Sequence, residues 1–297
     1  MPCGERSAAK REAIGSCVSA HVYSGARRPS GAAAPGQRPR QHERWARGVQ
    51  LRLTQDVYLV AGGDNGLNMT HSKDSHVYLI DAGDELVLID AGFGPAQAQI
   101  EANIRADGLD PSRITKVLVT HYHADHAGGL AGWKRSYGSR VFTGQEAADP
   151  IRQGDSYWNG LAWAQSFNFY PPEYVLEPCE VDEELIGGET IEVGRLRFEA
   201  IYTPGHCKGH FCYLLHGTDR RYLFSGDAVF WGGKIVLQNV VDVSIPDYAA
   251  SMAKLRELDF DALMPGHLTF SLQNGKRHVE RADNEFRQIG APRNLLA

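Results

Sequence analysis

Short apolar runs separated by turn-forming residues dominate the chain from residue 51 onward. They predict two groups of strands, at 56–60, 76–81, 85–90 and 116–120, and then at 189–193, 195–202, 211–215 and 221–224. Apolar positions at helical spacing predict helices at 95–105, 248–258 and 277–289. Two groups of strands, each followed by helices, indicate a layered α+β domain rather than a regular βαβ series.

Two segments depart from this pattern. Residues 1–48 show no helical or strand period, which predicts a disordered N-terminal extension ahead of one folded domain at residues 49–297. Because the extension is rich in Arg and Ser and poor in acids, an organelle transit peptide is the alternative. Residues 154–175 are irregular and aromatic, which is typical of a lid over a binding site or of a segment that covers the core.

The charge is distributed unevenly along the chain. Residues 1–48 hold nine Lys or Arg and three Glu, a net charge of +6, which leaves −11 for residues 49–297. A folded part this acidic should repel phosphate backbones, so a nucleic-acid partner is not expected. No apolar run approaches the roughly 20 residues that span a bilayer, so no membrane partner is expected. The sequence predicts no oligomeric state.

Cysteine usage bears on the compartment. The chain has five cysteines and no C-x-x-C pair, so it has neither a disulfide framework nor a Cys-rich zinc site. A reducing compartment fits this usage best. We therefore expect a cytoplasmic protein, with organelle targeting by the N-terminal segment as the alternative.

The run H-Y-H-A-D-H at residues 121–126 carries the strongest chemical signal, directly after a predicted strand. Along an extended backbone His121 and His123 point to the same side, and Asp125 and His126 follow as the chain turns. Burying three imidazoles and a carboxylate without partners is costly, and a metal supplies the partner. Imidazole with carboxylate and no thiolate suits Zn²⁺, with Fe or Mn as alternatives.

Three later segments repeat one layout, a short apolar strand followed by a glycine and a possible ligand. They are T-P-G-H ending at His206, S-G-D ending at Asp227 and P-G-H ending at His267. Glycine lets the backbone turn sharply next to the ligand. Seven candidate ligands suit two divalent ions, each with an open position for water or substrate.

These motifs resemble, in order and combination, those of the metallo-β-lactamase-fold hydrolases, from about residue 51 to residue 267. The resemblance implies a four-layer αββα sandwich with the site at one edge of the two sheets. It implies that Asp90, in L-I-D-A-G at 88–92, supports the site from outside the ligand set. It also implies the roles of the seven ligands: His121, His123 and His206 for the first metal, Asp125, His126 and His267 for the second, and Asp227 as the bridge.

The expected reaction is hydrolysis, because two adjacent cations generate a bridging hydroxide near neutral pH. The hydroxide would attack a lactone or ester carbonyl, with Asp227 holding the metal pair and Asp125 orienting the nucleophile as the catalytic carboxylates. Lactonases are favoured because they share all seven ligands and Gly226-Asp227-Ala228. The expected substrate is a small molecule with an apolar portion.

Several alternatives remain open. A glyoxalase II-like thioesterase has a similar ligand set but carries a helical C-terminal domain, whereas 30 residues follow His267. A mononuclear iron persulfide dioxygenase-like oxidoreductase shares the H-x-H-x-D-H run. A β-lactamase-like amide hydrolase is a third, although its thiolate class has Cys where Asp227 stands. A non-catalytic binding module is a fourth, which retention of every ligand disfavours.

The remaining histidines and aromatic residues have weaker assignments. Five histidines match no ligand position and are predicted to be surface or packing residues: His71, His76, His210, His216 and His278. Three aromatic residues are proposed to contact substrate: Tyr122, between two ligands, and Trp158 and Trp163 in the 154–175 segment.

Overall fold

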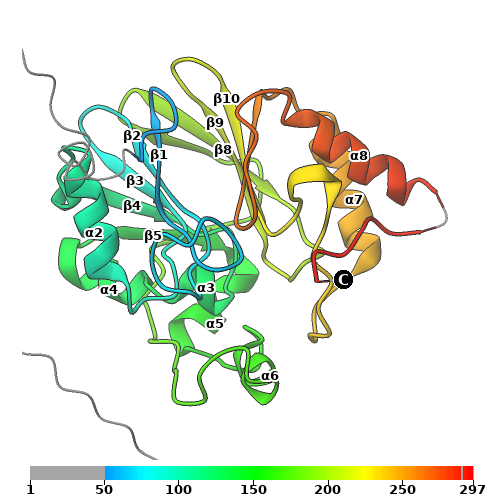
Figure 1. Ribbon diagram of the computed structural model, residues 1–297, viewed down its shortest axis with the longest axis horizontal. Coiled ribbons are helices and arrows are strands. Elements are labelled where there is room, and N and C mark those ends of the chain that lie inside the picture. Colours follow the sequence, from blue (N-terminus) through cyan, green and yellow to red (C-terminus); the bar gives the residue numbers. More distant parts are fainter. Residues whose placement is uncertain (1–50, 289, 297) are drawn as a thin grey trace, which may run out of the picture. The chain divides into compact units, whose positions relative to one another are not determined.

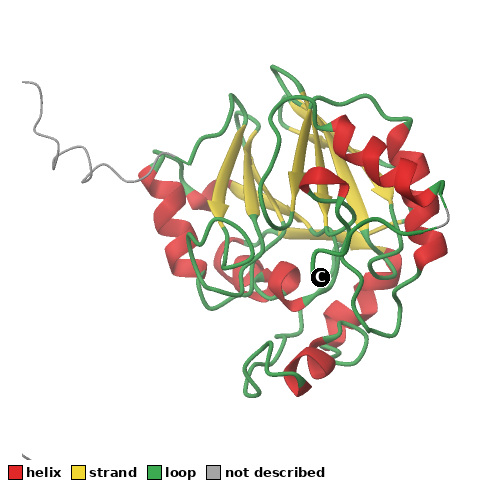
Figure 2. Cartoon of the chain, turned by 45° about the vertical axis from the view of Figure 1, so that its right-hand side comes forward, coloured by secondary structure: helices red, strands yellow, loops and turns green. Residues whose placement is uncertain are grey.

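The computed structural model describes residues 51–288 and 290–296 of the chain. Two β-sheets lie face to face, with helices α2 and α4 outside the first sheet and α7 and α8 outside the second (Figures 1 and 2). The predicted four-layer αββα sandwich is confirmed. The boundary predicted after residue 48 lies outside the described residues.

The first sheet has six strands in the order β1-β2-β3-β4-β5-β6. The strands β1 to β3 pair antiparallel, and each later strand pairs parallel with the one before it. Their bounds are Val57–Ala61, Val77–Asp81, Leu86–Ile89, Ile114–Leu118, Arg140–Gly144 and Glu183–Leu185. Helices cover one face and the second sheet covers the other, so the β1 and β3 runs are buried throughout.

The second sheet has five strands in the order β11-β10-β9-β8-β7. Their bounds are Thr190–Val193 (β7), Leu196–Tyr202 (β8), Phe211–His216 (β9), Arg221–Gly226 (β10) and Ala262–Pro265 (β11). Strands β7 to β10 form an antiparallel meander, whereas β10 and β11 are parallel. Strands β8, β10 and β11 therefore end at the same edge of the sheet.

The space between the sheets is filled by large apolar side chains from both inner faces. Tyr78 of β2 meets Phe224 of β10 at a ring separation of 5.3 Å, and both belong to one buried cluster that spans the sandwich. Beyond the end of β4 the sheets are also joined by hydrogen bonds, from Phe211 N–H to Thr120 O at 2.7 Å and from Tyr213 O–H to Val119 O at 2.8 Å. Hydrogen bonds as well as apolar packing therefore fix the two sheets to each other here.

Helices α2, α4, α7 and α8 bury one face each against the outer faces of the sheets. The α-helices are Gln97–Ala106 (α2), Ala124–Ala127 (α3), Leu130–Tyr137 (α4), Gln145–Gln153 (α5), Leu161–Ser166 (α6), Ile245–Arg256 (α7) and Lys276–Phe286 (α8); the 3-10 turns are Pro111–Arg113 (η1) and Trp231–Gly233 (η2). Helix α7 begins after Ser244, whose hydroxyl accepts the Asp247 N–H. Its Met252 and Leu255 pack under the second sheet with Val279 of α8, as their spacing predicts.

The sequence pattern did not indicate β5, β6 or α5. Strand β6 is three residues long and includes two glutamates, so it has no apolar run to detect. The 154–175 segment contains a short helix, α6, which lies at the lower edge of the molecule in Figure 1. In the described part of the chain, no helix is long and apolar enough to cross a membrane.

Candidate metal centre

The seven predicted ligands gather at the edge where strands of both sheets end. His121 and His123 follow β4, and Asp125 and His126 lie in α3. His206 follows β8, Asp227 follows β10 and His267 follows β11. The four motifs, which are far apart in the sequence, thus form a single cluster, because the loops after these strands converge.

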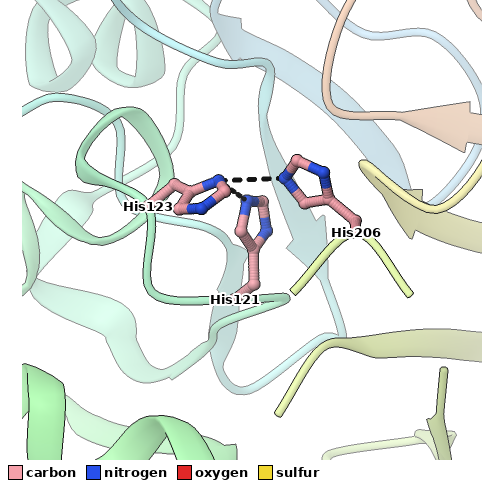
Figure 3. Close-up of side chains that lie close together, drawn as sticks. All are labelled: His121, His123 and His206. Atoms are coloured by element: carbon pink, nitrogen blue, oxygen red, sulfur yellow. Dashed lines mark hydrogen bonds between the residues drawn. The ribbon is translucent and has the colours of Figure 1, made fainter. Parts of the chain in front are cut away.

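Three imidazoles converge at one point, as Figure 3 shows for His121, His123 and His206. The Nδ1 atom of His123 lies 3.1 Å from His121 Nε2 and 2.9 Å from His206 Nε2. Burial lowers the pKa of His121 and His206 well below the ordinary histidine value, so both rings are neutral. Neutral imidazole nitrogens at this spacing are the donor set of a transition-metal site.

A second group lies on the other side of the cluster. His267 Nε2 lies 3.1 Å from Asp125 Oδ2, and His126 Nε2 lies 3.6 Å from the same oxygen. These three side chains place one possible ligand atom each within 4.8 Å of the others. They are the three residues expected to hold the second ion.

Asp227 lies between the two groups. Its Oδ2 is 3.6 Å from His206 Nε2, whereas its Oδ1 is 3.4 Å from His126 Nε2 and 3.6 Å from His267 Nε2. Although burial alone would raise the pKa of this carboxyl, His267 and His126 lower it well below its usual value. One carboxylate that presents an oxygen to each group has the geometry of a bridging ligand.

The residues fit divalent metal ions. His123 Nε2, His126 Nε2 and Asp227 Oδ1 are buried and have no hydrogen-bond partner within the described chain. Buried polar atoms are nearly always paired, so a cluster with several unpaired atoms needs a ligand. Two histidine-rich groups with a shared carboxylate have the chemistry for two ions, and Zn²⁺ suits this donor set, as Fe and Mn do.

Asp90 orients His126 from behind, in the position that the sequence resemblance implied. Its Oδ2 accepts the His126 Nδ1–H at 2.8 Å, and its Oδ1 accepts the Thr120 N–H at 2.7 Å. A carboxylate on the rear nitrogen sets the tautomer of a metal-binding histidine. The bond leaves His126 Nε2 directed at Asp125 and Asp227.

His210 was expected to be a surface or packing residue; it is fully buried and also makes hydrogen bonds beside the cluster, a role the sequence did not indicate. Its Nε2 accepts the Asp227 N–H at 3.2 Å, and its Nδ1 lies 2.9 Å from Thr203 Oγ1. His210 therefore holds the backbone of the bridging carboxylate. No sequence signal marked it, because the contact joins the residue before β9 to the residue after β10.

Gly266 allows the final ligand loop to pass close to the cluster. A Cβ atom at this position would lie 2.6 Å from His126 Cε1 and 2.7 Å from Asp227 Oδ1. Side-chain atoms do not approach that closely, so the glycine before His267 is required by space. The repeated glycine-ligand layout in the sequence has this physical reason at Gly266.

A cavity of about 290 Å³ opens directly onto the cluster. Its floor includes His123, Asp125, Asp227 and His267. Most of its walls are apolar and come from the aromatic segment, from residues 236–240 and from two further leucines: Trp163, Phe167, Phe169, Tyr170, Val236, Leu237, Val240, Leu295 and Leu296. Four amide side chains complete the lining: Asn65, Asn159, Gln238 and Asn239. No lysine or arginine belongs to this lining, so the described cavity suits an uncharged group that is largely apolar.

The three aromatic residues proposed as substrate contacts lie in different places. Trp163 lines the cavity at the cluster. Tyr122 and Trp158 line a separate hollow with Glu146 and Lys208. The Tyr122 side chain is buried and donates its O–H to Asp242 Oδ2, so it points away from the cluster cavity. Alternation along the strand end sends it to the opposite side from His121 and His123.

Tyr170 contacts the cluster, which the sequence did not indicate. Its O–H donates to Asp125 Oδ1 at 2.9 Å, and its ring stacks on Phe93 at 5.1 Å. Burial and the Asp125 charge raise the pKa of this phenol well above its usual value, so it remains a donor. The aromatic composition of residues 154–175 marked the segment but could not distinguish Tyr170 from its neighbours.

Comparison with known proteins identifies the family. The family described as "Metallo-beta-lactamase superfamily" matches residues 73–267, more than half of the chain. The chain belongs to the metallo-beta-lactamase superfamily. The resemblance inferred from the motifs is therefore confirmed.

Among the relatives of this superfamily member are two thioesterases. The "Atrochrysone carboxyl ACP thioesterase" of Aspergillus fumigatus is 26% identical over 80% of this chain and 64% of its own length. The "Acyl-coenzyme A thioesterase MBLAC2" of Gallus gallus is 27% identical over 73% of this chain and 79% of its own length. The chain thus spans less than two thirds of the first of these relatives.

Solved structures of the superfamily have the same fold. BJP-1, a subclass B3 metallo-beta-lactamase of Bradyrhizobium japonicum, is 25% identical, with a TM-score of 0.58 over 73% of this chain and 76% of its own. Membership in this superfamily and the thioesterase relatives support the predicted enzyme class, a hydrolase.

Proposed function

We propose that the protein is a metal-dependent hydrolase of acyl thioesters whose acyl group is apolar. The observation that carries this proposal is the cavity that opens onto the His/Asp cluster, with mostly apolar walls, four amide side chains and no lysine or arginine in its described lining. A pocket that is mostly apolar with a few convergent polar groups is the usual form of a small-molecule site.

The thioester replaces the lactone or ester that we favoured from the sequence. The names of two relatives, an acyl-carrier thioesterase and an acyl-coenzyme A thioesterase, support this choice. Lactone, ester and amide carbonyls pass through a similar tetrahedral intermediate, so these substrates become comparison arms of the test. The proposed partner is a small molecule with an apolar portion.

The residues that would hold the metals are those of the two groups. We assign His121, His123 and His206 to one ion, and Asp125, His126 and His267 to the other, with Asp227 shared. Bound divalent ions lower the pKa of a coordinated water and stabilise negative charge on a carbonyl oxygen.

The chain's own groups position the reaction. Tyr170 holds Asp125 Oδ1, which leaves Oδ2 directed at His267. The apolar walls exclude water from the acyl side of the carbonyl, which strengthens electrostatic interactions at the cluster.

The leaving group needs little assistance. Thiols have a pKa of about 8.5, so a thiolate departs without a dedicated general acid. The Tyr170 phenol, which lines the cavity beside the cluster, already donates to Asp125. Apart from the predicted ligands, the other neutral donors of the described lining are amides and the Trp163 indole, which are not acids. This arrangement suits a thioester better than an amide, whose amine must be protonated as it leaves.

A substrate panel with metal analysis tests the proposal. Acyl thioesters, acyl lactones, aryl esters, a β-lactam and a phosphodiester are compared by kcat/KM, with metal content measured on the same preparation. We expect thioesters to exceed every other class by about tenfold or more, equivalent to about 1.4 kcal/mol in the transition state.

Two results would contradict the proposal. A lactone or ester with the higher kcat/KM would restore the lactonase assignment. One iron per chain together with oxygen uptake would identify an oxidoreductase of the persulfide dioxygenase type.

A further inference from the structure

A second hollow adjoins the cavity at the metal centre. It measures about 500 Å³ and is lined by residues 157–166 on one side and residues 239–241 on the other. Both hollows share the same four lining residues: Gly160, Trp163, Asn239 and Val240. The two spaces therefore meet along one boundary, where α6 faces the 239–241 segment.

Gly160 lies at this boundary, near both the cluster and the 239–241 segment. This residue has a φ of +71°, and a Cβ atom on it would lie 3.4 Å from Val240 Cγ1 and 3.7 Å from His123 Nε2. The residue before α6 therefore lies beside both His123 of the cluster and Val240. The hollows share three side chains, of Trp163, Asn239 and Val240, and the two apolar ones, Trp163 and Val240, lie on opposite sides of the boundary.

The lining of the second hollow resembles the walls of the first, being mostly apolar or aromatic with a few uncharged polar groups. Besides the shared residues, its lining consists of Tyr157, Ala162, Ser166 and Val241. None of these side chains is ionisable near neutral pH. An apolar chain leaving the first cavity at this boundary would continue to lose water contact, which favours binding.

We propose that the two hollows form one acyl-binding groove, and that Trp163 and Val240 form a partition that sets the length of the acyl chain. The inference rests on the proposed thioester hydrolysis and names the part of the substrate that the structure selects. Short and medium chains fill the cavity at the cluster, and longer chains must displace the indole of Trp163 to reach the second hollow.

Trp163 suits this role better than its neighbours. It lies on α6 with 45% of its surface exposed, so its ring is held on one face and can be removed without opening the core. Trp158 is similar in type and exposure, at 41%, but lines the separate hollow beside Tyr122 and Lys208. The sequence treats these two tryptophans alike, whereas the structure places only Trp163 at the boundary.

The expected effect on chain length follows from burial. Each methylene that enters an apolar groove raises affinity by about fourfold. In the wild-type protein this gain stops where the chain meets Trp163. In Trp163→Ala the gain continues into the second hollow, so the preferred chain becomes longer.

The test measures kcat/KM for a series of N-acetylcysteamine thioesters from butyryl to palmitoyl. We expect Trp163→Ala to move the optimum to a longer chain and to raise kcat/KM for the longest substrates by about tenfold relative to the shortest. Val240→Trp narrows the same boundary from the opposite side and should move the optimum to a shorter chain. Trp158→Ala is the matched control, and its optimum should stay at the wild-type length.

A binding measurement keeps the groove testable without turnover. The same chain lengths are titrated as free carboxylates by calorimetry on the metal-loaded wild type and variants, with unfolding temperature and bound metal recorded as checks. We expect the affinity series to shift in the same direction as the kinetic series.

The outcomes separate the two proposals. If wild-type protein hydrolyses no thioester but its carboxylate series shifts in Trp163→Ala, the groove stands and the proposed reaction fails. If Trp163→Ala and Trp158→Ala give the same series, or if carboxylates show no dependence on chain length, the partition is wrong.

Discussion

The hydroxyl of Tyr170 donates a hydrogen bond to Asp125 Oδ1 at 2.9 Å. This contact ties the aromatic segment to the metal centre, since Asp125 Oδ2 faces His267 and His126. The neighbouring Tyr174 offers a natural comparison, because its hydroxyl donates to the Phe93 carbonyl at 2.7 Å instead. The two tyrosines share a segment and stack on the same phenylalanine, but only Tyr170 touches a predicted ligand.

Tyr170→Phe should weaken metal binding by about tenfold, because hydrogen bonds behind a ligand typically contribute 10- to 100-fold. Competition with a chelator measures this affinity directly. In Tyr174→Phe the free energy of unfolding should fall by about 1 kcal/mol, whereas the metal affinity should equal that of the wild type. Equal metal affinities in the two variants would show that Tyr170 has only a packing role.

Asp227→Asn should reduce bound metal from close to two ions per chain. The amide keeps the shape of the carboxylate but removes the negative charge shared by the two groups. Elemental analysis after dialysis gives the stoichiometry, and Asp149→Asn, on the exposed face of α5, serves as the control. Full occupancy in Asp227→Asn, or a single ion in the active wild type, would argue against the shared-ligand assignment.

Asn294→Ala should loosen one wall of the cavity. The Asn294 side chain bonds both backbone groups of Leu237, accepting its N–H and donating to its carbonyl, each at 3.1 Å. This clasp holds Leu295 and Leu296 in the cavity lining. We expect KM to rise several-fold with kcat little changed, the pattern of lost uniform binding.

Asn284→Ala is the control for that variant, because Asn284 is exposed on α8 and absent from the cavity lining. Its KM should equal the wild-type value. A fall in kcat at constant KM in Asn294→Ala would mean that the Asn294–Leu237 hydrogen bonds affect the metal centre rather than the cavity wall formed by Leu237, Leu295 and Leu296.

His278 should make stability depend on pH below 6.5. Burial, with the Arg277 and Arg281 charges, lowers its pKa to about 4, and its Nδ1 accepts the Gly232 N–H at 2.9 Å. The unfolded chain binds a proton first as pH falls, so the stability contributed by the neutral ring is complete above pH 6.5 and is lost towards pH 4.

We expect a loss of about 2 kcal/mol across this range, allowing for solvent screening at the ring. Urea unfolding of wild type and His278→Gln at each pH measures it, because effects of acid on the metal centre cancel in the difference. A constant difference between the two proteins from pH 7 to pH 4 would contradict the assignment.

The fold and the clustering of the candidate ligands could be predicted because their signals are local. The H-x-H-x-D-H run places four candidate ligands within one strand end and one turn, and each remaining candidate follows its own strand and glycine. Apolar runs likewise marked most strands, because a strand buried on both faces is apolar along its length. Strand β6, with Glu183 and Glu184, shows where this signal fails.

The supporting contacts could not be predicted, because they join residues far apart in the chain. His210 holds Asp227 across two strands, and Tyr170 reaches Asp125 across 45 positions. No sequence pattern indicates which group a hydroxyl or an imidazole will hydrogen-bond, since the partner depends on how the loops pack.

The sequence by itself indicated the family, the layered fold and the seven candidate ligands, since periodicity and motif spacing act over a few residues. Only the tertiary structure decided that Trp163 lies at the cavity whereas Tyr122 and Trp158 line another hollow. Composition treats these three aromatic residues alike. The direction of each side chain depends on how α6 and the loops after β4 and β10 pack over the cluster. That packing is set by contacts between segments that are far apart in the sequence.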